Sequence, residues 1–249
     1  MTTVLALDAT SSACSAAVWR CAGDDLTTAQ LFGRYEIAPR AHTHKLMPMV
    51  RDVLAEAGLM LADVDVVAYG RGPGAFTGIR IAAGMAQGLA LGLDRPMVAV
   101  SSLEALALGA ALQQGDVQAQ PVAALGALDA RMGEVYVGGY LVDLAQPMRP
   151  QMTAFIDEQV CAPEAIVCSA ALPERIVAAG AGLAFSERYP QPLAQAITAA
   201  NVDAEPDAAC IARLAAGAYL AGNAVAPELA QPVYLRDNVA TRSTRKPLD

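Results

Sequence analysis

The stretch at residues 69–93, "YGRGPGAFTGIRIAAGMAQGLALGL", places four glycines in one turn and more glycines in the segment that follows, which has a helical pattern. It comes after an apolar run at 64–70 and before another at 97–100, and both runs predict buried strands. A strand, a helix and a strand joined by short connections predict a right-handed parallel crossover. The stretch therefore predicts an α/β fold, and the question is what its glycines contact.

Two phosphate-binding motifs are excluded in this stretch. The P-loop requires G-x-x-x-x-G-K-[ST], and no pair of glycines here has that spacing followed by lysine. The dinucleotide fingerprint G-x-G-x-x-G fails because Gly70 and Gly72 lead to Ala75, and Gly72 and Gly74 lead to Thr77. An anion at the N-terminus of the helix stays open, since free N–H groups point outward there.

The glycines of the predicted helix at 75–92 form a ridge. Gly84, Gly88 and Gly92 recur every four residues and so share one face. Each interior glycine costs about 1 kcal/mol relative to alanine, so the ridge gives up about 3 kcal/mol of helix stability. Close approach of another backbone would offset this cost, as in small-xxx-small helix contacts. The spacing alone leaves open packing within the same lobe or an interface with another subunit.

A second predicted helix, at 42–57, has a wide apolar face. Its apolar residues span about 160° at about 100° per residue, whereas one buried face needs only about 100°. The excess indicates one packing partner inside the domain and another outside it. The residues of this arc are Leu46, Met47, Met49, Val50, Val53 and Leu54.

Two rounds of strands followed by a helix predict two similar α/β lobes. We divide the chain into an N-terminal lobe at 1–101 joined by the helix at 207–221, a C-terminal lobe at 102–206 and a tail at 222–249. A Pro-rich region at 147–206 is predicted to be irregular apart from one strand ending in a glycine turn at 176–182. The other predicted strands lie at 4–9, 14–20, 31–37, 122–130 and 134–142.

Composition and charge exclude several classes of protein. The chain of 249 residues has a formal net charge of −8, which argues against an independent nucleic-acid binder because such proteins need a basic surface. The apolar run at 81–93 is shorter than the ~20 residues of a membrane span. "MTTVLALDAT" lacks the basic region of a signal peptide, and five scattered cysteines indicate free thiols in a reducing compartment. We expect a soluble cytoplasmic protein that does not contact a membrane.

The sequence "GRGPGAFTGIRIAAGMAQGLALGL" followed by "VAVSSLEALA" resembles the signature of the TsaB (YeaZ) family, the dimerisation subunit of the bacterial tRNA threonylcarbamoyladenosine (t6A) machinery. The likeness covers the N-terminal half almost continuously and the rest in patches. It extends to "LALDATSSACSAAV", "HTHKLMPMVRDVLAEAGL", "VDVVAYG", "LDARMGEVYVGGY" and "QPVYLR".

The resemblance implies a two-lobed actin/Hsp70/sugar-kinase-like (ribonuclease H-like) fold, with mixed sheets flanked by helices. It further implies a non-catalytic scaffold. In such complexes a paralogous TsaD-like subunit transfers threonylcarbamoyl from its adenylate to N6 of adenosine 37 in ANN-decoding tRNAs, and a TsaE-like ATPase resets the assembly. The TsaB-like subunit pairs with the transferase, or with itself when alone, and meets tRNA only indirectly. The alternative is a stand-alone ATP-dependent small-molecule kinase or ATPase of the same superfamily.

The resemblance also implies where the subunits meet, namely on the helices at 42–57 and 75–92. It favours the interface interpretation of both the wide apolar arc and the glycine ridge. We expect the interface to contain His44, Met47, Val50, Leu54, Phe76, Arg80, Gly84 and Gly88.

Both phosphate loops of the superfamily have lost a glycine. Where active relatives have D-x-G-[TS] after the first strand, this chain has "DATS", so Asp8, Thr10 and Ser11 form a degenerate phosphate loop that is the candidate cofactor site. The second loop, D-x-G in relatives, is "DAR" at 129–131. We expect no catalytic residue and no firmly bound cofactor. A weakly held ATP or ADP, near Gly180 and Gly182 or at the subunit junction, stays open.

The remaining polar residues predict little chemistry. His42 and His44 are the only histidines, and their spacing points the rings about 200° apart on a helix, so no metal site is expected. The group Asp129, Arg131 and Glu134 forms either a surface ion pair or a functional groove. The basic residues near the end are solvated, or they contact the partner or tRNA phosphates. These residues are Arg236, Arg242, Arg245 and Lys246.

Overall fold

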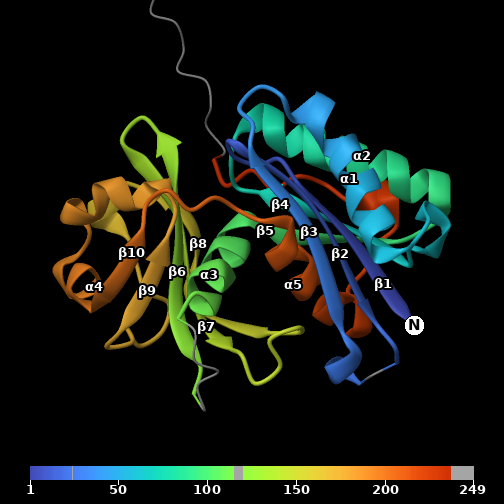
Figure 1. The fold of residues 1–249 in the computed structure, drawn as a ribbon. Coiled ribbons are helices and arrows are strands. Elements are labelled where there is room, and N and C mark those ends of the chain that lie inside the picture. The colour runs from blue at the N-terminus through green and yellow to red at the C-terminus, as the bar shows by residue number, and fades with distance from the viewer. Residues whose placement is uncertain (24, 115–119, 237–249) are drawn as a thin grey trace, which may run out of the picture.

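The computed structural model describes residues 1–23, 25–114 and 120–236, and these residues contain two five-stranded mixed sheets (Figure 1). The order in the first sheet is β3-β2-β1-β4-β5. β2 is antiparallel to both β1 and β3, whereas β4 runs parallel to both β1 and β5. The strands are β1 (Thr2–Asp8), β2 (Ala13–Cys21), β3 (Gln30–Ile37), β4 (Val66–Gly72) and β5 (Met97–Ser101).

The second sheet repeats the topology of the first. Its order is β10-β9-β6-β7-β8, with an antiparallel β6-β7-β8 meander and β9 parallel to both β6 and β10. The two sheets thus have the same topology, and the predicted two-lobed α/β fold is confirmed. The strands are β6 (Val122–Arg131), β7 (Glu134–Asp143), β8 (Gln151–Cys161), β9 (Ile176–Ala179) and β10 (Ile197–Asn201).

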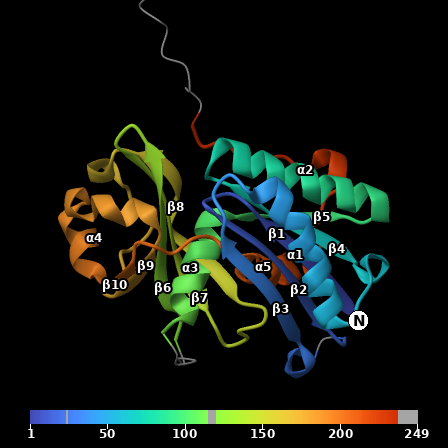
Figure 2. The ribbon, with the colours of Figure 1, turned by 45° about the horizontal axis from the view of Figure 1, so that its top comes forward.

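Helices cover both faces of each sheet. α1 (His42–Ala57) and α2 (Phe76–Leu93) lie on the outer face of the first sheet, where Figure 2 shows them next to each other on the surface. α5 (Ala208–Leu220) covers its inner face, and α3 (Ser102–Leu112) covers the facing side of the second sheet. Beyond the second sheet lie α4 (Gln191–Ala196) and the 3-10 helix η4 (Ala181–Arg188). The lobes share the apolar core formed around α3 and α5.

Local sequence signals explain several helix ends. Ser101 begins α3 by accepting hydrogen bonds from the backbone N–H of Leu103 at 3.1 Å and of Glu104. Asp207 begins α5 in the same way through Ala209 N–H. α1 ends at Gly58, whose φ of 67° is the left-handed conformation that glycine adopts without strain. These caps fix where the inner helices begin relative to the sheets.

The prediction of an irregular region at 147–206 is wrong. The region contains β8, β9, β10, α4 and η4. β8 has 11 residues, but it is an edge strand in which apolar and polar residues are mixed and only Phe155 and Ile156 are buried. It forms because its backbone pairs with β7, so it lacks the continuous apolar run by which a buried strand is predicted.

Candidate functional site: an open helix face and two closed loops

The glycine ridge of α2 faces away from the protein. Gly84, Gly88 and Gly92 are exposed, and a Cβ built on any of them has no described heavy atom within 4 Å outside its local backbone. The opposite face of the helix is buried on the first sheet through Ala82, Ala83, Ala86 and Ala90. The spacing left open whether the ridge packs within its own lobe or against another subunit. Among the described residues, the ridge does not pack within its own lobe. We call Gly84, Gly88 and Gly92 the glycine strip.

The glycines of the preceding turn and of the first turn of α2 have a different role. A Cβ on Gly70 would lie 2.0 Å from Asp8 Oδ1, one on Gly74 would lie 2.2 Å from the carbonyl oxygen of Thr10, and one on Gly78 would lie 2.0 Å from that of Ala9. Only glycine lets the β4–α2 connection lie this close to the loop after β1. The stretch that predicted the fold thus contains one set of glycines packed inside the lobe and another left open.

The apolar composition of α2 fits a folded lobe. Among the described residues, α2 is the one helix that is long and apolar enough, by length and composition alone, to cross a membrane. Its buried face packs on β4, however, and the Gln87 amide donates hydrogen bonds to the carbonyl oxygens of Pro227 at 3.1 Å and Ala230 at 2.8 Å. The exposed apolar side chains Phe76 and Leu91, 62% and 56% exposed, extend the open face at its two ends. α2 is thus a surface helix of a folded lobe, with one face buried and the other open.

The predicted interface residues on α1 divide into two groups. His44 is exposed and Met47 is partly buried, so both present atoms to the surface. Val50 and Leu54 are 0% and 4% exposed and belong to the core between α1 and the first sheet. The chain itself covers these two side chains, and their place in the interface stays a prediction. The apolar arc is wide because α1 packs on β2, β3 and α2. We define the docking face as the glycine strip together with His44, Met47, Phe76 and Arg80.

One end of the docking face is ordered by an aromatic–cation cluster. The Arg80 guanidinium lies 3.3 Å from the Phe76 ring centroid and 5.0 Å from that of Tyr234. Arg80 Nη1 also donates to the carbonyl oxygen of Phe76 at 3.1 Å. These contacts hold an exposed guanidinium in one place, which lowers the entropy that it loses when a partner binds. Sequence reasoning found Phe76 and Arg80 but missed Tyr234, whose only signal was the "QPVYLR" segment.

The first phosphate loop is closed by the chain itself. Asp8 and Thr10 are fully buried and bonded to each other, with Thr10 Oγ1 at 3.0 Å from Asp8 Oδ1. Ser102 Oγ donates to Thr10 Oγ1 at 3.0 Å. Ser11 is half-buried, and its Oγ accepts the Ala13 N–H at 3.2 Å. The side chains of Asp8 and Thr10 are therefore engaged inside the lobe, and the cofactor site at these residues stays a prediction.

The electrostatics of this loop also disfavour phosphate. The pKa of Asp8 is raised to about 7, mainly by burial and to a smaller extent by the nearby carboxylates Asp207 and Glu205, while hydrogen bonds from Thr10 oppose the rise. Ser12 Oγ donates to Glu205, so that carboxylate stands at the mouth of the loop. A phosphate approaching here meets acidic groups.

The second loop is a tight turn with its own ion pair. Asp129 Oδ1 accepts the Arg131 N–H at 2.7 Å, and the Arg131 guanidinium lies 3.2 Å from Asp129 Oδ2. The surface-ion-pair alternative holds for these two residues. Glu134 instead bonds Arg236, which also donates to the carbonyl oxygen of Ala130 at 3.1 Å. Arg236 is therefore not a solvated tail residue, whereas Arg242, Arg245 and Lys246 lie outside the described residues.

The glycines considered for a nucleotide are packed on the chain. A Cβ on Gly180 would lie 2.1 Å from the carbonyl oxygen of Ala127, and one on Gly182 would lie 2.8 Å from the Leu128 nitrogen. Both glycines thus pack closely on β6, and a weakly held nucleotide near them stays a prediction. Among the described residues no cluster of three His, Cys, Asp or Glu side chains could hold a metal. His42 is buried, and its Nε2 donates to the carbonyl oxygen of Ser11 at 3.0 Å, so its role is structural.

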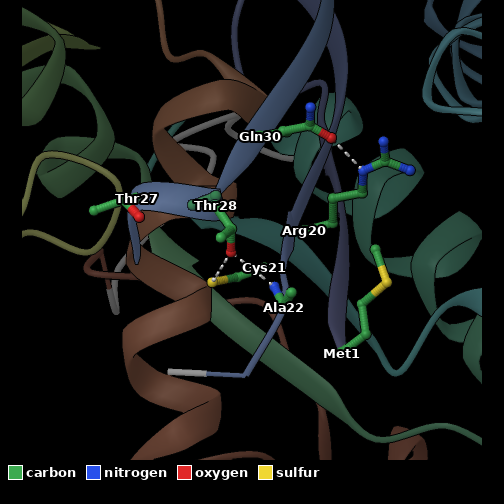
Figure 3. Close-up of a pocket in the computed structure, with 8 residues that line it drawn as sticks. Met1, Arg20, Cys21, Ala22, Thr27, Thr28 and Gln30 are labelled. Atoms are coloured by element: carbon green, nitrogen blue, oxygen red, sulfur yellow. Dashed lines mark hydrogen bonds between the residues drawn. The ribbon is translucent and has the colours of Figure 1, made fainter. Parts of the chain in front are cut away.

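A shallow hollow of about 600 Å³ lies at the far end of β2, between residues 20–22 and 27–30 (Figure 3). Its one charged side chain is already engaged: Arg20 Nε donates to Gln30 Oε1 at 2.7 Å, and Arg20 Nη1 donates to the carbonyl oxygen of Ala57 at 2.6 Å. Cys21 Sγ donates to the carbonyl oxygen of Asp25 at 3.2 Å. The hydroxyls of Thr27 and Thr28 likewise donate to Asp25, so the polar side chains of the lining are bonded to their neighbours.

Two lobes with the same sheet order, each covered by helices on both faces, define a protein of the actin/Hsp70/sugar-kinase class, and both of its phosphate loops are altered. A family model described as "TsaD: tRNA N6-adenosine threonylcarbamoyltransferase" matches residues 35–244. The tRNA threonylcarbamoyladenosine biosynthesis protein TsaB of Escherichia coli is 39% identical over 95% of this chain and 96% of its own length. The corresponding Haemophilus influenzae protein is 36% identical over 95% of this chain. The chain belongs to the TsaB (YeaZ) family.

The structural comparison agrees with this assignment. YeaZ from Pseudomonas aeruginosa superimposes with a TM-score of 0.80 at 41% identity, covering 94% of this chain and 100% of that one. The likeness to transferases named as such is local. A tRNA N6-adenosine threonylcarbamoyltransferase of Methylibium petroleiphilum is 49% identical over 69 residues, which are 28% of this chain and 20% of that protein.

Proposed function

We propose that this chain is a non-catalytic scaffold subunit of t6A biosynthesis, which pairs through its docking face with a paralogous threonylcarbamoyltransferase. The observation that carries the proposal is the glycine strip. It gives up about 3 kcal/mol of helix stability, and no described part of the chain approaches it to offset that cost. A second helix lying flush against the strip supplies the missing contact.

The non-catalytic role is supported by the two loops. A phosphate-binding loop must present N–H groups and space to its ligand. Here the side chains of Asp8 and Thr10 bond each other in a filled interior, and Arg236 caps the turn between β6 and β7. Nothing in these contacts favours the alternative of a stand-alone kinase or ATPase.

The partner is inferred from the local likeness to the transferases. Two chains that share a helix pair can place both pairs together as a four-helix bundle with the small residues at the centre. The same geometry allows a homodimer when the chain is alone. A TsaE-like ATPase completes the assembly, and the acidic chain, with net charge −8, meets tRNA only through its partner. We place this assembly in the cytoplasm, with ATP or ADP held at most weakly at the subunit junction.

The test is a Gly88→Leu variant. A leucine at this exposed position needs no room inside the lobe, so the variant folds, but its side chain separates the two helices. We expect loss of co-purification with the co-expressed transferase and loss of self-association in sedimentation analysis. Gln195→Leu adds the same side chain at an exposed position of α4 and is the matched control. Normal pairing by Gly88→Leu contradicts the docking face, and ATP turnover by the isolated wild-type chain contradicts the non-catalytic role.

A further inference from the structure

The segment Pro227–Arg236, part of the region predicted as a tail, lies along the first lobe and ends on the second. It follows a backbone pair between Val225 and Met97 at the edge of the first sheet. The Tyr69 hydroxyl then donates to the carbonyl oxygen of Gln231 at 3.0 Å, and Val233 N–H donates to that of Arg71 at 2.9 Å. Figure 1 shows this segment, in red, running close to α2. We call residues 227–236 the strap.

The strap contacts the docking face and the second lobe through consecutive residues. The ring of Tyr234 packs in a tilted arrangement against that of Phe76, with centroids 6.1 Å apart, and also contacts Arg80 of the docking face. Two residues later, Arg236 bonds the β6–β7 turn through Glu134, Ala130 and the Met132 sulfur. The Arg236 side chain is 16% exposed and that of Glu134 is 39% exposed, so the ion pair is partly shielded from water.

A second bridge between the lobes starts at the residue that holds the strap. Arg71, whose carbonyl accepts the strap's Val233 N–H, extends its side chain to Glu158 of β8 at 3.1 Å. The Tyr140 hydroxyl donates to the same carboxylate at 3.1 Å. Because Arg71 contacts both Glu158 and Val233, a movement of the second lobe is transmitted to β4 and to the strap together.

The other end of the lobe contact is fixed differently. The buried Trp19 donates its Nε1–H to the carbonyl oxygen of Met148 at 2.8 Å, and Arg213 donates to that of Pro147. These contacts follow the end of β7, whereas the strap meets the turn before its start. The second lobe is thus anchored at one end by a buried indole and at the other by charges carried on the strap.

We propose that the strap couples the position of the second lobe to the docking face, so that the Arg236–Glu134 contact sets how well Phe76, Arg80 and Tyr234 are presented to a partner. The proposal rests on the proposed docking role. Its physical basis is that Tyr234 and Arg236 are only two residues apart. When the Arg236 contacts are lost, Tyr234 is free to leave its cluster with Phe76 and Arg80.

The test uses charge reversal in the full chain. Arg236→Glu places like charges opposite Glu134, and the double variant with Glu134→Arg restores an ion pair with its sign reversed. We expect Arg236→Glu to speed hydrogen exchange in the strap and in the first turn of α2. We also expect it to weaken transferase binding by about fivefold to a hundredfold, the usual range of coupling between sites. The double variant recovers both. Arg188→Glu breaks the ion pair with Glu164 within the second lobe and is the matched control.

Each outcome decides the proposal. Unchanged exchange in the first turn of α2 overturns the coupling, as does faster exchange without loss of binding. If Arg236→Glu loses both slow exchange and transferase binding, and the double variant recovers neither, the losses come from a general defect. That result also overturns the coupling. If wild-type protein binds no transferase and does not self-associate, the proposed function fails, and the exchange data alone then decide whether the strap orders the α2 face.

Discussion

Alanine at the open glycines is expected to stabilise the isolated chain. Gly84 and Gly88 are interior positions of α2 with room for a methyl group. Glycine is about 1 kcal/mol less favourable than alanine at such positions. The Gly84→Ala/Gly88→Ala variant should therefore raise the free energy of unfolding by about 2 kcal/mol, and the midpoint of thermal unfolding by about 4–8 °C for a chain of this size.

The same variant should bind its partner less well. Each methyl group enters the space where the facing backbone is proposed to lie, and overpacking costs about 1–3 kcal/mol. We expect weaker association by about tenfold or more. Urea unfolding monitored by circular dichroism at a concentration where the chain is monomeric measures the first effect, and isothermal titration calorimetry with the transferase measures the second. A variant that gains stability but loses affinity for its partner identifies glycines that are kept for binding and not for folding.

Gly78→Ala is the internal control because it lies on the same helix. Its Cβ would stand 2.0 Å from the carbonyl oxygen of Ala9, so the variant should lose stability. A loss of stability in Gly84→Ala/Gly88→Ala would show that the chain itself covers the strip. A gain of stability with unchanged partner binding would show that no backbone lies there, and either result refutes the reasoning.

Two further substitutions test the interior next to the docking face. Because the pKa of Asp8 is raised to about 7 from an ordinary value near 4, folding favours its protonated form, and the free energy of unfolding falls as pH rises from about 4 to 7 by up to about 4 kcal/mol. Asp8→Asn removes this dependence, so its free energy of unfolding in urea should rise relative to that of wild type between pH 5 and 8. A difference in the free energy of unfolding that stays constant with pH would contradict the raised pKa. Leu54→Ala should lower the free energy of unfolding of the monomer by about 2–5 kcal/mol, since the side chain is in the core. A change below about 0.5 kcal/mol, typical of a surface site, would return Leu54 to the interface.

The two-lobed α/β fold could be predicted because its signals are local. The apolar runs of β1, β4 and β5 are buried strands, and Ser101 is a helix cap by virtue of its side chain alone. The glycine strip was likewise visible, since a spacing of four residues places side chains on one face of any helix.

Which surfaces stay open depends on tertiary packing. Gly78 and Gly84 lie on the same helix, yet one packs on the loop after β1 and the other contacts nothing in the described chain. Val50 and Met47 belong to one apolar arc but differ in burial, because the depth of α1 depends on the sheet below it. The periodicity of apolar residues defines the faces of a helix. Which face is covered depends on where segments distant in the sequence pack.

The strap shows the same limit most clearly. Arg236 and Glu134 are separated by 102 residues, and Arg71 and Glu158 by 87. No local pattern marks such pairs, since any exposed arginine and glutamate would look alike in sequence. Local sequence signals were therefore enough to predict most elements outside residues 147–206, their apolar faces and the lost glycines of the phosphate loops. The packing of one lobe against the other decided which charges meet, because ion pairs form only where the folded backbone brings them within a few ångströms.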